Sequence, residues 1–295
     1  MSALPQTPRR GSHSGIWQEQ LRVVARNREA LIGGVLFVLV ASAALLGFVW
    51  TPHPVNAFDI TAAFAPPSLE HLAGTDEYGR DIFSRIMTGG QASLGISVAA
   101  VVMALAVGLV LGSLTGYIGG LLDLFVTRVI DVVMAVPALV LAIGLVAVLG
   151  PSGISVAIAL AFAYAPAFAR VFRSVVVATR DQPYVQASHG LGVPDSQVLL
   201  KDILPNVLPI MVVQAATALA WGIMDEASLG FLGLGVQPPS PSWGSLLIEG
   251  RQFMFDAPWL PVSAGIAVAM AVLGINLLGD ALRDVLDPRD WGRLW

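Results

Sequence analysis

Six predominantly apolar stretches dominate the chain, and each is long enough to cross a lipid bilayer as a helix. The first, residues 30–50, contains no charged side chain, and about 20 helical residues rising 1.5 Å each span the ~30 Å hydrocarbon core. Hydrophobic residues make up 56% of the 295 residues and charged residues only 12%, a balance that is rare in water-soluble domains. We therefore predict an all-α integral membrane protein with six transmembrane helices. The other five stretches are residues 92–118, 124–149, 153–172, 207–234 and 262–278.

Polar segments divide the chain into parts. A small-residue triplet at 41–43 would suit a signal-peptide cleavage site, but it lies inside the first apolar stretch and not after it. The first stretch is therefore predicted to be an uncleaved anchor, with a short interfacial helix before it from about Gln18. The expected parts are a cytoplasmic N-terminal segment at 1–29, the first transmembrane helix at 30–50, an extracytoplasmic segment at 51–90, a five-helix core at 91–280 with a cytoplasmic loop at 181–205, and a cytoplasmic tail at 281–295.

Basic residues predict the orientation in the membrane. If the N-terminus is inside, 13 of the 16 Lys and Arg residues fall on inner segments, and only Arg80, Arg85 and Arg251 fall on outer ones. Cytoplasmic segments of membrane proteins carry such an excess of basic residues. Both termini and the 181–205 loop are therefore predicted to be cytoplasmic. Three tryptophans are expected in an aromatic belt at the outer boundary: Trp50, Trp243 and Trp259.

Two features of the third apolar stretch, 124–149, bear on its helix. Arg128 and Asp131 are three residues apart and share a helix face, which predicts an ion pair near the membrane interface; a role in a transport path is the alternative. Pro137 lacks a backbone N–H and crowds the preceding turn, so it is expected to kink the helix. We interpret the kink as a bend, with a gate as the alternative.

The segment 181–205 is polar although apolar stretches lie on both sides of it. Pro183 suits the first position of a helix, Gly192 suits the left-handed residue that follows a helix end, and Pro194 can open a new helix. The pattern predicts an elbow of two short helices, which we call the elbow below. Small residues on its first helix permit close docking of another protein. An apolar set at helical spacing distinguishes it from a merely solvated loop: Val198, Leu199, Ile203 and Leu204.

Several kinds of chemistry are not expected in this chain. A phosphate-binding loop needs Gly-Lys-Ser/Thr, but the only lysine, Lys201, lies between Leu200 and Asp202. The chain has no cysteine, so disulfides and thiolate nucleophiles are excluded. The four histidines, at positions 13, 53, 71 and 189, are in different segments without ligand spacing, so no metal site is expected. We predict no cofactor in this chain and no catalytic residue.

The elbow resembles the signature of the inner-membrane permease subunits of ABC importers. That signature is Glu-Ala-Ala, three residues, Gly, and then a stretch that ends in an apolar residue, Leu and Pro. Here Gln186, Ala187 and Ser188 stand at the first three positions, Gly192 follows, and Ile-Leu-Pro ends the stretch at 203–205. Gln186 and Ser188 depart from the family pattern, and Gln186 removes the charge of the family's glutamate.

Three further motifs resemble the second permease subunit of the dipeptide/oligopeptide/nickel branch. They are Gly-Thr-Asp-Glu-Tyr-Gly-Arg-Asp at 74–81, Glu-Ala-Ser-Leu-Gly-Phe-Leu-Gly-Leu-Gly-Val-Gln-Pro-Pro at 226–239, and Asn-Leu-Leu-Gly-Asp at 276–280 followed by an Asp-Pro-Arg at 287–289. The resemblance runs from residue 71 to residue 289. It implies the six-helix fold of type I ABC importer permeases, in a bacterial or archaeal cytoplasmic (inner) membrane.

The resemblance also implies partners and site residues. The expected complex contains a second related permease, two ATPase subunits that hold ATP and Mg²⁺, and an extracytoplasmic solute-binding protein; no nucleic acid is expected. The cargo is expected to be a peptide, with nickel, glutathione or another small solute as alternatives. The alternative hypotheses are an ATP-independent secondary transporter and an intramembrane enzyme. The first is not favoured because no clear internal repeat is visible, and the second because no acid/base cluster is visible. The residues expected to couple the permease to its ATPase are Tyr184, Gln186, Ala187, Ser188, Gly192, Leu204 and Pro205.

Overall fold

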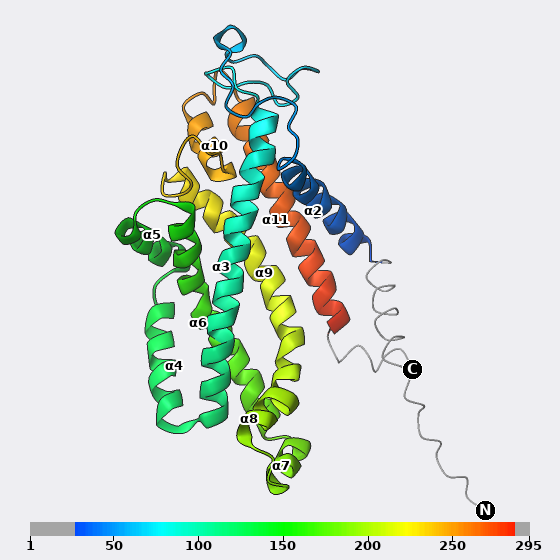
Figure 1. The fold of residues 1–295 in the computed structure, drawn as a ribbon, viewed down its shortest axis with the longest axis vertical. Coiled ribbons are helices and arrows are strands. Elements are labelled where there is room, and N and C mark those ends of the chain that lie inside the picture. The colour runs from blue at the N-terminus through cyan, green and yellow to red at the C-terminus, as the bar shows by residue number, and fades with distance from the viewer. Residues whose placement is uncertain (1–26, 287–295) are drawn as a thin grey trace, which may run out of the picture.

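The computed structural model describes residues 27–286, and in this part of the chain the fold is a helical bundle with no strand (Figure 1). Five segments are long and apolar enough to cross a membrane, and a bent pair of shorter helices raises the number to six if it counts as one span. The all-α membrane fold is therefore confirmed. The expected interfacial helix and most of the terminal segments 1–29 and 281–295 lie outside the described residues. The five long helices are α2 (Arg28–Leu46), α3 (Ile82–Ile118), α6 (Gly153–Arg180), α9 (Leu204–Phe231) and α11 (Trp259–Leu286).

Helix α3 is the longest element and begins about ten residues earlier than the apolar pattern predicts. The reason is a cap: Asp81 Oδ2 accepts a hydrogen bond from the Ser84 backbone N–H at 2.8 Å, so the polar residues after it are already helical. The lower half of α3 packs closely on α6 through Gly108, Gly112 and Gly116. A Cβ at Gly112 would lie 2.5 Å from the Ala169 carbonyl oxygen, so only glycine permits this approach.

Pro137 has a larger effect than the expected kink. The third apolar stretch is two helices, α4 (Gly120–Met134) and α5 (Ala138–Leu149), which are bent by 89° relative to each other. Pro137 itself is extended, with φ −55° and ψ 134°, and serves as the N-cap of α5. A proline disfavours the helical conformation of the residue before it, so the chain turns here instead of bending gently. The break falls at the predicted residue, but it is a turn of 89° between two helices and not the gentle bend that we expected.

Ion pairs join α4 to α6 near the elbow end of the bundle. Asp131 binds Arg170 at 2.6 Å, and not Arg128 as the spacing predicts. Asp123 accepts two hydrogen bonds from Arg173, each of 2.5 Å, in a bidentate pair. In both pairs the arginine comes from α6, so packing between helices and not spacing along α4 decides the partner.

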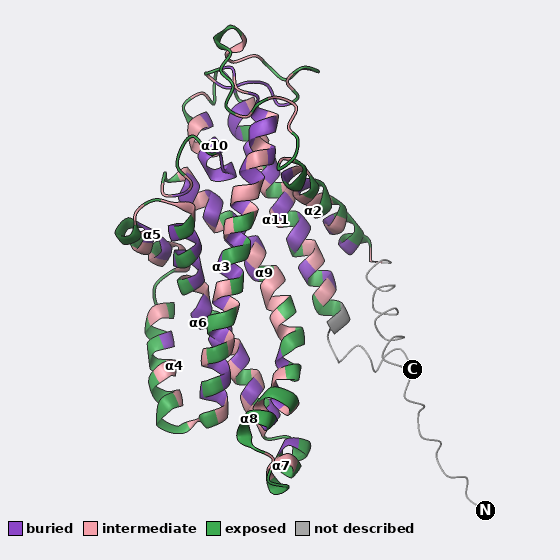
Figure 2. Ribbon diagram, viewed as in Figure 1, coloured by how far each residue is buried: buried purple, intermediate pink, exposed green. Residues whose placement is uncertain are grey.

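Burial separates an inner core from outward apolar faces (Figure 2). On α2 the exposed side chains include Leu31, Val35 and Val38, as expected for a helix that faces lipid. Trp243, in contrast, is 1% exposed and its Nε1–H donates to the Ile86 carbonyl at 3.1 Å. The indole of Trp259 donates to the Thr75 carbonyl at 3.2 Å. Trp243 is therefore a core residue and Trp259 is half-buried against the segment before α3, so of the expected belt only Trp50 is largely exposed.

Candidate coupling site

The elbow projects from one end of the bundle, between the end of α6 and the start of α9 (Figure 1). It consists of the short helix α7 (Pro183–Gly190), one turn α8 (Asp195–Gln197) and a π-helical segment η2 (Val198–Ile203). Pro183 is at the first position of α7, as predicted, because its missing N–H would have no partner there. Two short helical segments lie at the opposite end of the bundle: η1 (Ile60–Ala62) and α10 (Trp243–Arg251).

The corner of the elbow is a Schellman motif. After Leu191 at the end of α7, Gly192 adopts a left-handed conformation with φ +76°. The Gly192 N–H donates to the His189 carbonyl at 2.9 Å, and the Val193 N–H donates to the Ser188 carbonyl at 3.1 Å. These two bonds satisfy carbonyls that the end of a helix leaves free. The predicted left-handed conformation of Gly192 is thus confirmed.

Gly192 is required by its backbone angle and not by crowding. A Cβ built on Gly192 would meet no atom within 4 Å. A side chain at this position would therefore point into open space on the outer surface of the elbow. A substitution would destabilise the corner only through the left-handed backbone conformation, which costs residues other than glycine about 1–2 kcal/mol of free energy.

The base of the elbow is buried in the main hydrophobic core. Val185 of α7 and Val198 and Ile203 of η2 are fully buried. They belong to one apolar cluster with Phe172 and Val176 of α6. The apolar positions predicted in the second half of the elbow therefore anchor it to the bundle. This burial packs α7 and η2 against α6 at close-packed density.

Tyr184 ties α7 to the start of α9. Its hydroxyl donates to the Asp202 carbonyl at 3.3 Å and accepts a hydrogen bond from Asn206 Nδ2 at 3.2 Å. Asn206 also donates to the Asp202 carbonyl at 2.7 Å. The π-helical turn of η2 leaves this carbonyl available, and the two side chains occupy it.

A second set of contacts ties the elbow to the end of α3. Tyr117 at that end donates its hydroxyl hydrogen to Asp195 Oδ1 at 2.8 Å, and its ring stacks on His189 with 6.2 Å between centroids. Arg180, the last residue of α6, donates to the Gly116 and Tyr117 carbonyls at 3.1 and 3.0 Å. Helices α3, α6 and α7 thus meet at the base of the elbow.

The family described as the inner membrane component of binding-protein-dependent transport systems matches residues 108–290. This match covers more than half of the chain and includes the whole elbow. The chain belongs to this permease family. A second family, described as the N-terminal transmembrane domain of oligopeptide transport permease C, matches residues 15–67.

Relatives of this permease align over nearly its whole length. The dipeptide transport system permease protein DppC of Alkalihalophilus pseudofirmus is 37% identical over 273 residues, which cover 92% of this chain and 90% of the relative. The di/tripeptide transport system permease protein DppC of Pseudomonas aeruginosa is 38% identical over 272 residues, 90% of this chain and 89% of the relative. The glutathione transport system permease protein GsiD of Escherichia coli O6:K15:H31 is 40% identical over 274 residues, 92% and 90%. The resemblance to ABC importer permeases is confirmed, and the family is a transport subunit of the inner membrane and not an enzyme.

The structure divides the predicted coupling residues of the permease into an exposed group and a supporting group. Gln186 and Ala187 are exposed on α7, and Gln186 Nε2 donates to the Arg180 carbonyl at 3.1 Å. An ionised glutamate at this position could not donate to that carbonyl. The glutamine that departs from the family pattern therefore satisfies a backbone carbonyl at the end of α6. Ser188 and Leu204 are half-buried, Leu204 against the core cluster. Tyr184 is 49% exposed, and Gly192 and Pro205 are exposed.

Sequence reasoning missed several residues at the elbow. Tyr117 and Arg180 hold its base, and Leu191, with 85% of its surface exposed, is its most prominent apolar side chain. The sequence contained a signal for Leu191. A leucine beside the corner glycine of a polar segment lies away from lipid, so an exposed apolar side chain there indicates a contact with another protein. For Tyr117 no signal was available, since its partner Asp195 is 78 residues away in the sequence.

The opposite end of the bundle holds a cluster of ion pairs. Arg85 Nη2 of α3 lies 2.7 Å from Glu249 Oε2 of α10, and Arg80 Nε lies 2.6 Å from Asp76 Oδ2. The side chain of Arg85 is 2% exposed. Burial raises the pKa of Glu249 above its usual range, and the attraction of Arg85 and Arg80 opposes this rise. These contacts fix α10 against the segment before α3.

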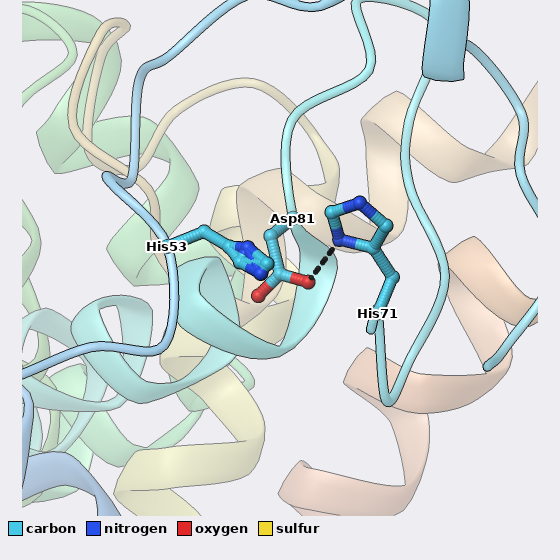
Figure 3. A group of neighbouring side chains, drawn as sticks. All are labelled: His53, His71 and Asp81. Atoms are coloured by element: carbon cyan, nitrogen blue, oxygen red, sulfur yellow. Dashed lines mark hydrogen bonds and ion pairs between the residues drawn. The ribbon is translucent and has the colours of Figure 1, made fainter. Parts of the chain in front are cut away.

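Two of the histidines lie together, contrary to the expectation from their sequence spacing. His53 and His71 lie beside Asp81 (Figure 3), and one possible ligand atom from each residue lies within 4.8 Å of the others. Their separation in the sequence did not reveal this contact, which forms because the loop that follows α2 folds back on the start of α3. These three residues are the group in the described part of the chain that could hold a metal ion.

Proposed function

We propose that this permease forms half of the translocation pathway of a peptide importer, and that a separate ATPase drives it by gripping the elbow. The observation that carries the proposal is the construction of the elbow: an exposed corner fixed by the Gly192 turn on a base buried against α6. A force on the exposed face would reach α6 and α9 without local unfolding. Alternating access by rigid-body movement of helices needs such an attachment.

The complex that we propose contains a second related permease, two ATPase subunits and an extracytoplasmic solute-binding protein. Dependence on a binding protein is supported by the family description. ATP and Mg²⁺ are assigned to the ATPase, which is consistent with the lack of a Gly-Lys-Ser/Thr sequence around Lys201. In this proposal the chain supplies a mechanical element and a path, and the chemistry of hydrolysis belongs to its partner.

The orientation that we propose places the elbow, the segment 1–29 and the tail 281–295 in the cytoplasm. The support is the distribution of charge: 13 of the 16 basic residues fall on that side. Basic residues near the elbow are Arg170, Arg173, Arg180 and Lys201, and those at the opposite end are Arg80, Arg85 and Arg251. The loop at 51–81 and helix α10 would then face the binding protein.

Within the elbow we assign two roles. Gln186, Ala187 and the exposed Leu191 would contact the ATPase, because they lie on the outer surface of α7 and its corner. Ser188, Gly192 and Leu204 would hold the shape of the elbow, together with Tyr184 at its base and Pro205 in the first turn of α9. The translocation path itself is not assigned to residues.

The cargo that we propose is a short peptide, because relatives with 37–40% identity carry names of dipeptide, di/tripeptide and glutathione systems. The test is uptake into proteoliposomes that contain the permease, its second permease, its ATPase and its binding protein. We expect uptake of a labelled dipeptide or tripeptide that requires both ATP and the binding protein. Glutathione and Ni²⁺ serve as competing cargoes. Uptake that continues without ATP and follows a proton gradient would contradict the proposal and favour a secondary transporter.

A further inference from the structure

Three side chains with metal-binding atoms converge at the end of the bundle opposite the elbow (Figures 1 and 3). His53 comes from the segment after α2, His71 from the loop that follows η1, and Asp81 from the N-cap of α3. His71 Nδ1 lies 2.9 Å from Asp81 Oδ1. The two imidazole rings have centroids 4.5 Å apart. The three residues therefore come from separate parts of the chain and meet at one point.

A buried serine orients these side chains. The Ser84 backbone N–H and hydroxyl both donate to Asp81 Oδ2, at 2.8 and 2.6 Å, which leaves Oδ1 facing His71. The same Ser84 oxygen accepts a hydrogen bond from the backbone N–H of His53 at 3.1 Å. Ser84 is fully buried, and the Asp81 side chain is 1% exposed. Outer partners that fix ligand side chains in this way are a regular feature of protein metal sites.

The donor set indicates the kind of ion. Two imidazole nitrogens and one carboxylate oxygen suit Zn²⁺ and similar divalent transition metals, whereas Ca²⁺ and Mg²⁺ prefer oxygen ligands alone. In a tetrahedral zinc site with bonds of about 2.0–2.1 Å, ligand atoms lie roughly 3.3 Å apart. The three atoms here are within 4.8 Å of one another, so small side-chain rotations bring them to that separation.

We propose that His53, His71 and Asp81 bind one divalent transition-metal ion of the Zn²⁺ class. The ion takes the proton's place between His71 and Asp81 and uses the neutral imidazoles and the ionised carboxylate as ligands. It fastens the 51–81 loop to the first turn of α3. A half-buried position, with His53 and His71 both partly exposed, keeps the site open to ions in solution.

The test measures zinc on the purified full-length chain, produced without a polyhistidine tag and treated with a chelator before zinc is added. We expect a single tightly held zinc ion per chain by elemental analysis, and its loss in His53→Gln, His71→Gln and Asp81→Asn. Asn is the suitable change at 81 because it keeps the N-cap acceptor while removing the charge. Ser84→Ala should weaken zinc affinity by about 10–100-fold.

The matched control is His189→Gln, which removes a partly exposed histidine at the other end of the bundle. It should retain zinc as the wild type does, and X-ray absorption of the wild type should show imidazole ligands. Equal zinc retention by the wild type and His71→Gln would overturn the proposal, as would failure of the wild type to hold zinc. If Asp81→Asn proves unstable, the His53→Gln and His71→Gln variants still decide the question.

Discussion

Replacing Gly192 with alanine tests whether the shape of the elbow matters for coupling. The added methyl group enters open space, so the change costs only the left-handed conformation at φ +76°, about 1–2 kcal/mol. This energy corresponds to a factor of roughly 5–30 in the equilibrium between the closed and open corner. The Val193 N–H, which donates to the Ser188 carbonyl in the closed corner, should then exchange with solvent faster by the same factor.

The control is Gly190→Ala, which adds the same methyl group two residues earlier. Gly190 is the last residue of α7, and a Cβ there also meets nothing within 4 Å. Alanine should therefore leave the corner intact and strengthen the short helix slightly. Measured in proteoliposomes, Gly192→Ala should lower the amount of solute imported per ATP hydrolysed, and Gly190→Ala should not. Wild-type exchange and import in Gly192→Ala would show that coupling does not depend on the Gly192 turn, and so would equal losses in both variants.

Three further changes test other parts of the structure. Tyr117→Phe keeps the ring but removes the hydrogen bond to the carboxylate on α8; exchange at the elbow should accelerate while the rest of α3 stays protected, and uniform protection would argue against this anchor. Trp243→Ala should lower the free energy of unfolding by about 3–5 kcal/mol, whereas Trp50→Ala, at an exposed position, should change it little; a denaturation series in detergent compares them. Because burial raises the pKa of Glu249, its contribution to stability is greatest below pH 4.5 and is lost as pH rises through the folded-state pKa. Relative to Glu249→Gln, the wild type should therefore lose thermal stability as pH rises above about 4.5, and a relative gain would show that the ion pair with Arg85 outweighs burial.

Local signals in the sequence predicted the first helix and the corner of the elbow. The second short helix that we expected is not separate, because α8 and η2 continue into α9 as one helix of 37 residues. Pro183 and Gly192 act through their own backbone restrictions, so their effect does not depend on distant residues. The apolar runs likewise predicted the membrane-spanning helices, because hydrocarbon thickness sets their length. The start of α3 was misplaced because the cap at Asp81 makes polar residues helical outside the apolar run.

What the sequence could not predict depends on contacts between distant segments. Pro137 indicated a kink, but the 89° angle accompanies packing of α5 against α6, which the local pattern does not contain. Trp243 resembled an interface residue until its burial against α3 placed it in the core. His53 and His71 meet only because the proline-rich segment between α2 and α3 folds back, and that segment has no periodic pattern from which such a contact could be read.

A crosslink from the elbow to the ATPase shows directly whether the elbow is the site of coupling. The chain has no cysteine, so a single Ala187→Cys variant carries one reactive thiol on the exposed face of α7. Leu69→Cys is the matched control, because Leu69 is 99% exposed at the opposite end of the bundle. With a crosslinker that joins cysteine to lysine, the assembled complex should give a permease–ATPase product from Ala187→Cys and none from Leu69→Cys. A product from Leu69→Cys and none from Ala187→Cys would contradict the proposal that the elbow is the site of coupling.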